Sequence, residues 1–148
     1  MREPTDKLRV AMQLLDRALV MYYEGDSYFA ALHLAGGAEE ILGVYVEREG
    51  VDSSFKSLQA GAVRISQLLD EGAEVTLKDI KQLMNYARNR TKHMNDIGDD
   101  DVHFDPKNEA YDILGRSISN YYTLMGSFNL PETELIRKLN SERAGAEE

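Results

Sequence analysis

Apolar residues recur every three or four positions along most of the chain, and no stretch alternates apolar and polar residues long enough to indicate a strand. The pattern predicts helices over residues 6–24, 27–48, 54–71, 76–95 and 105–125, and a short one that begins at Pro131. Consecutive helices with short connections pack antiparallel to each other. The sequence therefore predicts an all-α fold, a bundle of five or six helices with an antiparallel, up-and-down core.

Local signals support several of these boundaries. Thr76 can cap the fourth helix, and Asp105 with Pro106 starts the fifth, because proline suits the first helical position. In the third helix, the residues at core spacing are Phe55, Leu58, Ala62, Ile65 and Leu69. The segment SERAGAEE carries no apolar anchor, so we expect a single domain over 1–148 with a disordered tail at 141–148.

Composition narrows the class of protein. The chain has 148 residues, of which 43% are hydrophobic and 29% charged, as in an ordinary globular domain. It lacks cysteine, which excludes disulfides and a cysteine nucleophile, and no Glu-x-x-His pair occurs on a predicted helix, so we expect no metal site and no cofactor. The apolar runs are too short for a membrane span, so we expect a cytoplasmic protein with no membrane partner.

Positive charge is concentrated in the fourth predicted helix, although the chain as a whole carries -9. Five lysines and arginines against one aspartate give +4 for 76–95, so the other residues carry -13. Steps of about 100° along this helix produce two arcs. The apolar arc contains Ile80, Leu83, Met84, Ala87, Thr91 and Met94. The polar arc contains Asn85, Arg88, Asn89, Lys92, His93 and Asp96. Such an arc is either a solvated face, whose cations offset the helix dipole, or a binding face.

The polar arc carries the marker of a known family. Arg88 is followed by four residues, Asn89 to Lys92, and then by His93, with a polar residue directly after the arginine. In this spacing the chain resembles the HEPN superfamily (higher eukaryotes and prokaryotes nucleotide-binding), a group of small helical bundles. The segments ALHLAGGAEEILG and NEAYDILGRSISNYYTLMG are also similar to small bacterial or phage members, so the resemblance covers about residues 26–126.

The resemblance implies a homodimer in which two copies of the fourth helix line one cleft and, in active members, a metal-independent ribonuclease. His93 would take the proton of a ribose 2′-hydroxyl, and Arg88 would bind the phosphate that this oxygen attacks. Asn89 would orient the histidine ring or bind the phosphate, and Lys92 and Asn85 would add phosphate contacts. Arg88 and His93 diverge by about 140° on one ideal helix, so a two-fold axis would bring Arg88 of one chain to His93 of the other.

The second helix and the segment after His93 modify this expected site. Glu40 or Glu39 is predicted to reach the cationic face and tune His93; the alternative is an ordinary surface glutamate. Some family members carry a tyrosine two residues after the histidine, where a partner nucleotidyltransferase attaches nucleotides, and this chain has Asn95 instead. The acidic segment NDIGDDDVHFDP would repel RNA; it is a solvated connector, a cation site or a lid.

Three functions from different classes stay open. The first is a dimeric HEPN-like endoribonuclease in a toxin–antitoxin or defence system, with RNA as substrate and an antitoxin or nucleotidyltransferase as partner. The second is a catalytically silent HEPN-like module that binds a nucleotide or a protein. The third is a helical bundle whose cationic face is only structural.

Overall fold

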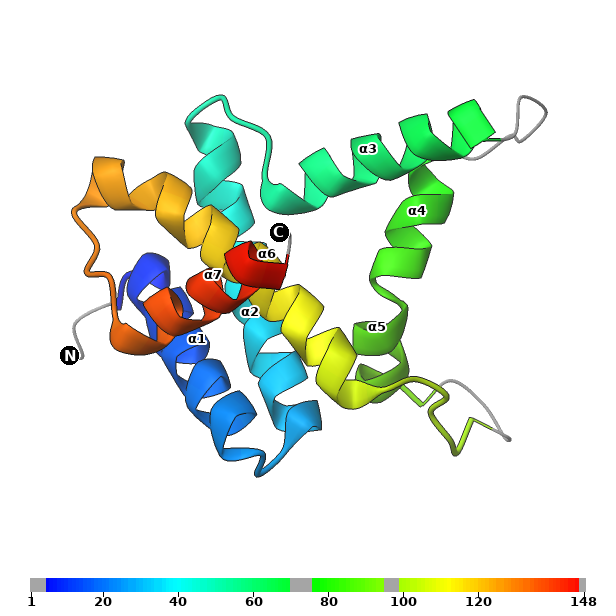
Figure 1. The fold of residues 1–148 in the computed structure, drawn as a ribbon, viewed down its shortest axis with the longest axis horizontal. Helices are drawn as coiled ribbons and strands as arrows, with labels where there is room; N and C mark the ends of the chain where they lie inside the picture. The colour runs from blue at the N-terminus through cyan, green and yellow to red at the C-terminus, as the bar shows by residue number, and fades with distance from the viewer. Residues whose placement is uncertain (1–4, 70–75, 95–98, 147–148) are drawn as a thin grey trace.

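The regular secondary structure of the chain is helical. The computed structural model describes residues 5–69, 76–94 and 99–146, and within these residues it contains seven helices and no strand. They are α1 (Lys7–Glu24), α2 (Tyr28–Arg48), α3 (Ser54–Leu69), α4 (Leu77–Met84), α5 (Tyr86–Lys92), α6 (Pro106–Phe128) and α7 (Glu134–Ala146) (Figure 1). The predicted all-α class is confirmed, and the arrangement is a helical bundle.

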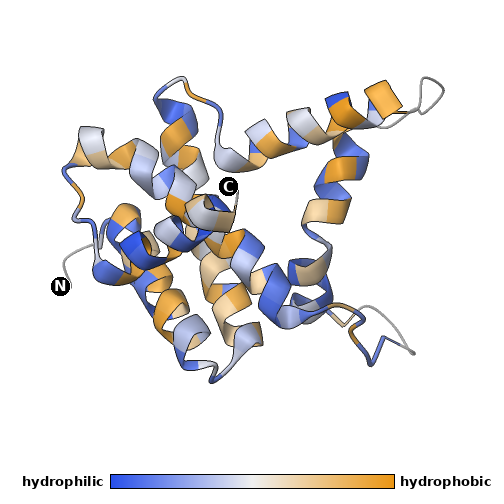
Figure 2. Ribbon diagram, viewed as in Figure 1, coloured by the Kyte–Doolittle hydropathy of each residue, from blue (hydrophilic) through white to orange (hydrophobic). Residues whose placement is uncertain are grey.

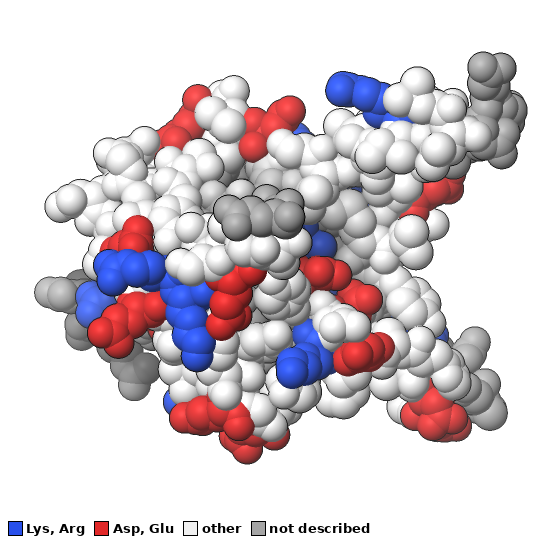
Figure 3. Space-filling view, viewed as in Figure 1, with Lys and Arg blue, Asp and Glu red and all other residues white. Residues whose placement is uncertain are grey.

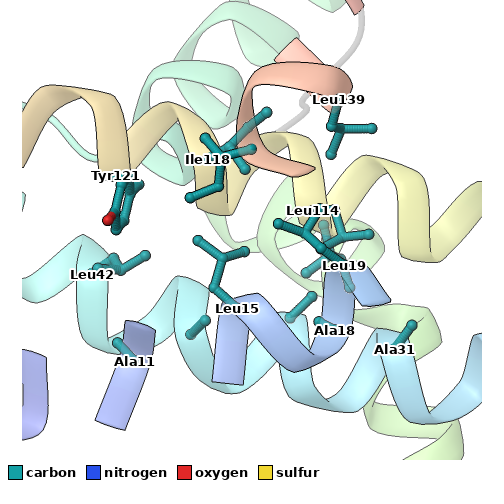
Figure 4. Close-up of a cluster of buried hydrophobic side chains, with 14 of the residues drawn as sticks. Ala11, Leu15, Ala18, Leu19, Ala31, Leu42, Leu114, Ile118, Tyr121 and Leu139 are labelled. Carbon is teal, nitrogen blue, oxygen red and sulfur yellow. The ribbon is translucent and has the colours of Figure 1, made fainter. Parts of the chain in front are cut away.

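Four helices, α1, α2, α6 and α7, form a packed unit that we call the body. α2 lies against both α1 and α6, and α7 crosses them (Figure 1). Figure 4 shows Leu15, Leu42, Leu114 and Leu139, one from each helix, pointing into a common core, and all four are fully buried. Burial of one such side chain stabilises the fold by about 1.5–3 kcal/mol. The body therefore has a complete core of its own.

The antiparallel pair α1 and α2 is fixed at its ends by caps. Asp6 Oδ1 accepts a hydrogen bond from the Leu8 N–H at 2.7 Å, and Ser27 Oγ accepts one from the Ala30 N–H at 3.1 Å. Gly25 ends α1 with a φ of 68°, in the left-handed region that favours glycine. After its cap at Ser27, α2 packs against α1 and α6 at the centre of the body, and its other side lines the cavity described below.

α3 and α4 extend from the body as a second unit, which we call the arm (Figure 1). None of the residues of α3 is buried, and Leu58, Ile65 and Leu69 are 51%, 58% and 83% exposed. Figure 2 shows hydrophobic positions along both helices of the arm. α3 and α4 are joined by few contacts, one of which is a hydrogen bond from Gln59 Nε2 to the Leu77 carbonyl at 2.5 Å. The prediction that Leu58, Ile65 and Leu69 pack into the core is therefore wrong within one chain.

The fourth predicted helix is divided at Asn85, which ends α4 and precedes α5 with a φ of -93° and a ψ of 0°. Asparagine is a poor helix former because its side chain competes for local hydrogen bonds. Here Asn85 Oδ1 accepts one from Arg88 Nη2 at 3.1 Å. The start of α4 is as predicted, since Thr76 and Asp79 form a reciprocal capping box. The break explains why seven helices are described where five or six were expected.

The apolar arc predicted for 76–95 is only partly buried. Ile80 and Ala87 are buried, as expected. Leu83 and Met94, in contrast, are 71% and 70% exposed, so the prediction is wrong at these two positions. Leu83 lies on the exposed side of α4, and Met94 lies beyond the end of α5 at Lys92, so neither continues the buried side that Ile80 and Ala87 form.

The C-terminal segment is ordered further than expected. Residues 141–146 continue α7, and two contacts hold them to the body. Tyr23 Oη donates a hydrogen bond to Glu142 Oε2 at 2.9 Å, and the Arg143 guanidinium lies 5.0 Å from the centre of the Tyr111 ring. The predicted disordered tail at 141–148 is therefore wrong for 141–146, and 147–148 lie outside the described residues.

Among the described residues, α2 is long and apolar enough to cross a membrane by length and composition alone. A buried core helix of a soluble protein meets the same test, and α2 packs between α1 and α6. The feature is weak evidence for a membrane span.

Candidate functional site

A cavity of about 490 Å³ opens between the body and the arm, where α2 faces α3, α4 and α5. Its volume is typical of small-molecule sites. Charged, amide and apolar side chains line it, and they include Glu39, Glu40, Gly43, Val44, Glu47, Phe55, Lys56, Lys81, Asn85, Arg88 and Asn120. We call this the Arg88 cavity. Figure 3 shows acidic and basic side chains interspersed over one face of the molecule, so that face carries no broad basic field.

Arg88 is held at the cavity by contacts with two elements. Its Nη1 lies 3.0 Å from Glu40 Oε1 of α2, and its Nη2 donates to Asn85 Oδ1. The aliphatic part of the side chain passes over Gly36, where a Cβ would lie only 2.8 Å from Arg88 Cδ. The Arg88 side chain is 16% exposed, so the guanidinium is positioned by its neighbours and still reaches solvent.

Glu40 confirms the expectation that a glutamate of the second helix reaches the cationic face. The residue that it contacts is Arg88, however, and no contact with His93 is found among the described residues. The Glu40 side chain is 64% exposed, so water solvates its carboxylate and the ion pair with Arg88 contributes little to stability. Glu40 therefore occupies part of the guanidinium fork in a way that an incoming anion could displace.

Glu39, the neighbouring residue, has a different role from the one predicted. Its two carboxylate oxygens accept hydrogen bonds from Arg116 of α6, from Nε at 2.9 Å and from Nη2 at 3.2 Å. Both side chains are buried. The Arg116 guanidinium also lies over the Phe55 ring, 5.8 Å from its centre. Glu39 is thus a structural partner of Arg116 at the inner wall of the cavity and does not tune His93.

His93, Asn89 and Lys92 are exposed and do not line the Arg88 cavity. His93 follows the last turn of α5 with extended backbone angles, and its N–H donates to the Asn89 carbonyl at 3.1 Å. The structure therefore brings Arg88, Asn85, Glu40 and Glu39 together, and leaves His93, Asn89 and Lys92 outside. Within one chain, the predicted catalytic set is not assembled.

Lys81 is a cavity residue that the sequence interpretation left out of the site. It lies one turn before Asn85 and two turns before Arg88, and all three line the cavity. The signal was present in the sequence, because spacings of four and three residues place side chains on one helical face. Lys81 adds a second cation to the cavity.

Asn120 is the second residue that was missed. Its Oδ1 accepts a hydrogen bond from the Ser54 N–H at 2.8 Å, and because a backbone N–H only donates, this bond fixes which end of the amide carries the nitrogen. Asn120 is 1% exposed, and its Nδ2 has no hydrogen-bond partner among the described residues. A Cβ on Gly43 would lie 3.7 Å from that nitrogen. The inner wall thus contains an unused donor.

The acidic segment before α6 makes structural contacts. Asp99 pairs with Arg90 of α5, Arg90 Nη2 donates to the Asp101 carbonyl at 3.5 Å, and Asp105 caps α6. Arg90 is therefore engaged with this segment rather than with the cavity. Within the described ranges, no group of three or more His, Asp or Glu side chains is placed to hold a metal ion. Asn95 and Asp96 lie outside the described residues.

A second cavity, of about 700 Å³, lies beside the start of α3, between α6 and α7. Asn120 and Arg116 line it, together with Arg143, whose guanidinium takes the space beside Gly115. Arg143 Nη1 donates to the Tyr111 carbonyl at 3.5 Å. None of the predicted site residues lines this cavity, so the Arg88 cavity is the candidate site.

The fold and the site define an all-α protein with a cavity between a packed body and an arm, lined by cations, glutamates and amides. Comparison with protein-family models, with curated proteins and with solved structures finds no match for this chain. The functional argument therefore depends on the geometry of the cavity.

Proposed function

We propose that this protein is a dimeric HEPN-like endoribonuclease that needs no metal ion and acts in the cytoplasm, in a toxin–antitoxin or defence system. An antitoxin or a nucleotidyltransferase is the corresponding protein partner. The observation that carries the proposal is the Arg88 guanidinium, which Gly36, Asn85 and Glu40 hold at the mouth of a cavity. A planar guanidinium positioned in advance suits a phosphate, since it can form two parallel hydrogen bonds with it.

Lys81 and Asn85 support a phosphate at this position. Both line the cavity with Arg88, so a bound phosphate would meet two cations and an amide. Glu40 would then exchange its contact with Arg88 for water, at little cost for a carboxylate that is already 64% exposed. The cavity can therefore accept an anion without refolding.

His93 supports the dimeric form of the proposal. It is exposed at the end of α5 and lies outside the cavity of its own chain, which leaves it available to a second copy. A neutral imidazole at that place would take the proton of the ribose 2′-hydroxyl. The 2′-oxygen would bond to phosphorus, and the 5′-oxygen would leave with a proton from the imidazolium or water. The products are a 2′,3′-cyclic phosphate and a 5′-hydroxyl.

The arm supports a second copy of this chain as the partner. Leu58, Ile65, Leu69 and Leu83 are each more than half exposed, and Asp79 is the one carboxylate in the sequences of α3 and α4. Exposed apolar side chains in this number are typical of a surface that a partner covers, with the exposed cations of the arm, Lys56, Arg64, Lys78 and Lys81, at the rim of that interface. Two arms that cover each other would also bring two copies of α5 toward one axis.

Cleavage of a mixed RNA pool in EDTA tests the proposal. The wild type should cut it and leave 2′,3′-cyclic phosphate ends, and His93→Ala should lower the rate by about 10²–10⁴-fold, the usual contribution of a general base. His103→Ala is the matched control, because His103 is also exposed. Arg88→Met keeps the aliphatic part over Gly36 and removes the charge, so it should be equally inactive. A wild type that cuts no RNA, or a His93→Ala variant as fast as wild type, contradicts the proposal.

Mixing two inactive variants tests whether the site is shared between chains. In a mixed dimer of Arg88→Met and His93→Ala, one site carries both lesions and the other carries none if each site combines Arg88 and His93 from different chains. Half of randomly exchanged dimers are mixed, and each has one intact site of two, so about a quarter of wild-type activity should return. A site within one chain predicts no recovery.

The second candidate is a catalytically silent module that binds a nucleotide or a protein. The observation that favours it is that Arg88 is already bonded to Glu40 and Asn85 while His93 lies outside the cavity. Arg88-dependent binding of nucleotides by a protein that leaves RNA intact would establish this alternative.

A further inference from the structure

We infer that the inner part of the Arg88 cavity is a pocket for the base of the nucleotide whose phosphate Arg88 binds. The base pocket depends on the proposed phosphate contact for its orientation. Its own features, however, are independent of that contact, because they come from α2, from the start of α3 and from α6.

The unused donor of Asn120 is the first of these features. A buried amide nitrogen without a hydrogen-bond acceptor destabilises a fold, and this fold keeps Asn120 Nδ2 in that state. The Ser54 N–H prevents the amide from turning over, so the nitrogen stays directed away from Ser54. A keto oxygen or an unprotonated ring nitrogen of a base is an acceptor that would satisfy it.

Phe55 and Arg116 provide the second feature. The Arg116 guanidinium lies over the Phe55 ring and is in turn held by buried Glu39. Phe55 and Val44 both line the cavity, so apolar surface lies beside the polar inner wall. Nucleobases stack favourably on aromatic rings, whatever their sequence. This combination of one apolar wall with one buried donor is typical of sites that bind a flat heterocycle.

Gly43 is the third feature. It is buried in the middle of α2 and lines the cavity beside Asn120. Glycine inside a helix lowers stability relative to alanine, so its presence calls for a reason in the packing. A Cβ at Gly43 would be in ordinary contact with Ser53 Cβ, at 3.5 Å, and would sit 3.7 Å from Asn120 Nδ2. A methyl group would fit here and would contact the donor, so it would narrow the inner part of the cavity.

Titration calorimetry in EDTA with two kinds of ligand tests the base pocket. One kind is the set of four common nucleoside 5′-monophosphates, and the other is ribose 5-phosphate, which lacks the base. Wild type should bind at least one nucleotide about tenfold or more tightly than ribose 5-phosphate, a difference of about 1.4 kcal/mol. Gly43→Ala should remove that advantage and leave the affinity for ribose 5-phosphate unchanged. Gly126→Ala is the matched control, because a Cβ at Gly126 of α6 meets no atom within 4 Å.

The outcomes separate this inference from the proposed function. If Gly43→Ala binds every nucleotide as the wild type does, or if ribose 5-phosphate binds as tightly as the nucleotides, the base pocket is refuted while Arg88-dependent phosphate binding stands. If wild type binds nucleotides through Gly43 but cuts no RNA, the pocket stands and the ribonuclease is refuted. If wild type binds no phosphate compound, the same titration is repeated with free nucleosides. Nucleoside binding that Gly43→Ala abolishes supports the base pocket. A wild type that binds no nucleoside overturns it.

Discussion

The body and the arm place the same kinds of residue in opposite environments. Leu42 and Leu114 of the body are fully buried, whereas Leu68 and Leu69 of α3 in the arm are 76% and 83% exposed. The body gains its stability from contacts within one chain. The arm has few such contacts, so its apolar residues contribute only when another surface covers them.

This difference determines how the candidate site is built. α2 and α6 supply a rigid inner wall, with the buried pair of Glu39 and Arg116 and the fixed amide of Asn120. Lys81 belongs to α4 of the arm, and Asn85 ends that helix. Segments with few buried contacts open at low free energy. The cavity therefore has one wall in a fixed position and a second wall whose position a partner or a ligand can stabilise.

Substitution of the two adjacent glutamates should give the largest difference in stability between the fixed wall of the cavity and its mouth. Glu39→Gln would leave Arg116 buried without a counter-charge, so we expect a loss of about 3–5 kcal/mol in the free energy of unfolding. Glu40→Gln, one residue along, removes an exposed partner of Arg88 and should change that free energy by less than about 1 kcal/mol. Urea unfolding followed by far-UV circular dichroism measures both. Equal effects of the two changes would show that the body and the cavity mouth do not differ in this way.

A pair of leucine truncations tests the packing of the two units. Leu42→Ala in the body should lower the free energy of unfolding by about 2–5 kcal/mol through lost burial and a residual cavity. Leu69→Ala in the arm should cost less than about 0.5 kcal/mol in dilute protein, since the side chain is 83% exposed.

Protein concentration extends the same test to the dimer. If a second copy covers the arm, the cost of Leu69→Ala should rise with protein concentration, and light scattering should show weaker association. A small cost at every concentration, with unchanged association, would refute the arm as the dimer surface.

The sequence predicted the body well because its signals are local. The start signal at Asp105 with Pro106, and the helical period of 6–24 and 27–48, come from neighbouring residues. Whether α3 packs against the core of its own chain was not predictable in the same way. An apolar stripe that faces the core of its own chain and one that faces a partner have the same period, so the sequence of 54–69 cannot separate them.

The site was predictable to a similar extent. Arg88, Asn85 and Glu40 do gather at one cavity, and Lys81 could have been added from its spacing. The pairing of Glu39 with Arg116 joins residues 77 positions apart, and Asn120 meets Ser54 across 66 positions. Such contacts depend on how helices pack, which the period of each helix does not reveal. At Asn85 the backbone hydrogen bonds from the Asn85 N–H to the Lys81 carbonyl and from the Asn89 N–H to the Asn85 carbonyl are kept, so the break is a local change of backbone angles that the helical period does not predict.

A smaller, pH-dependent effect tests the body without touching the arm. Tyr121 is buried on α6, and its hydroxyl donates to the Pro131 carbonyl at 2.6 Å. Burial, with a smaller contribution from Asp16, raises the Tyr121 pKa from 10.0 to about 12. Because the folded pKa is the higher one, the neutral phenol stabilises the fold fully below pH 10, and this contribution is lost as the pH rises toward 12.

Tyr121→Phe should therefore be less stable than wild type by about 1 kcal/mol at pH 8, the usual contribution of one hydrogen bond. The difference should shrink between pH 10 and pH 12, because only the wild type has this phenol to ionise on unfolding. Urea unfolding at several values of pH measures it. A difference that stays constant over this range would show that Tyr121 ionises equally in the folded and unfolded chains, and that its burial in the body is less complete than the structure indicates.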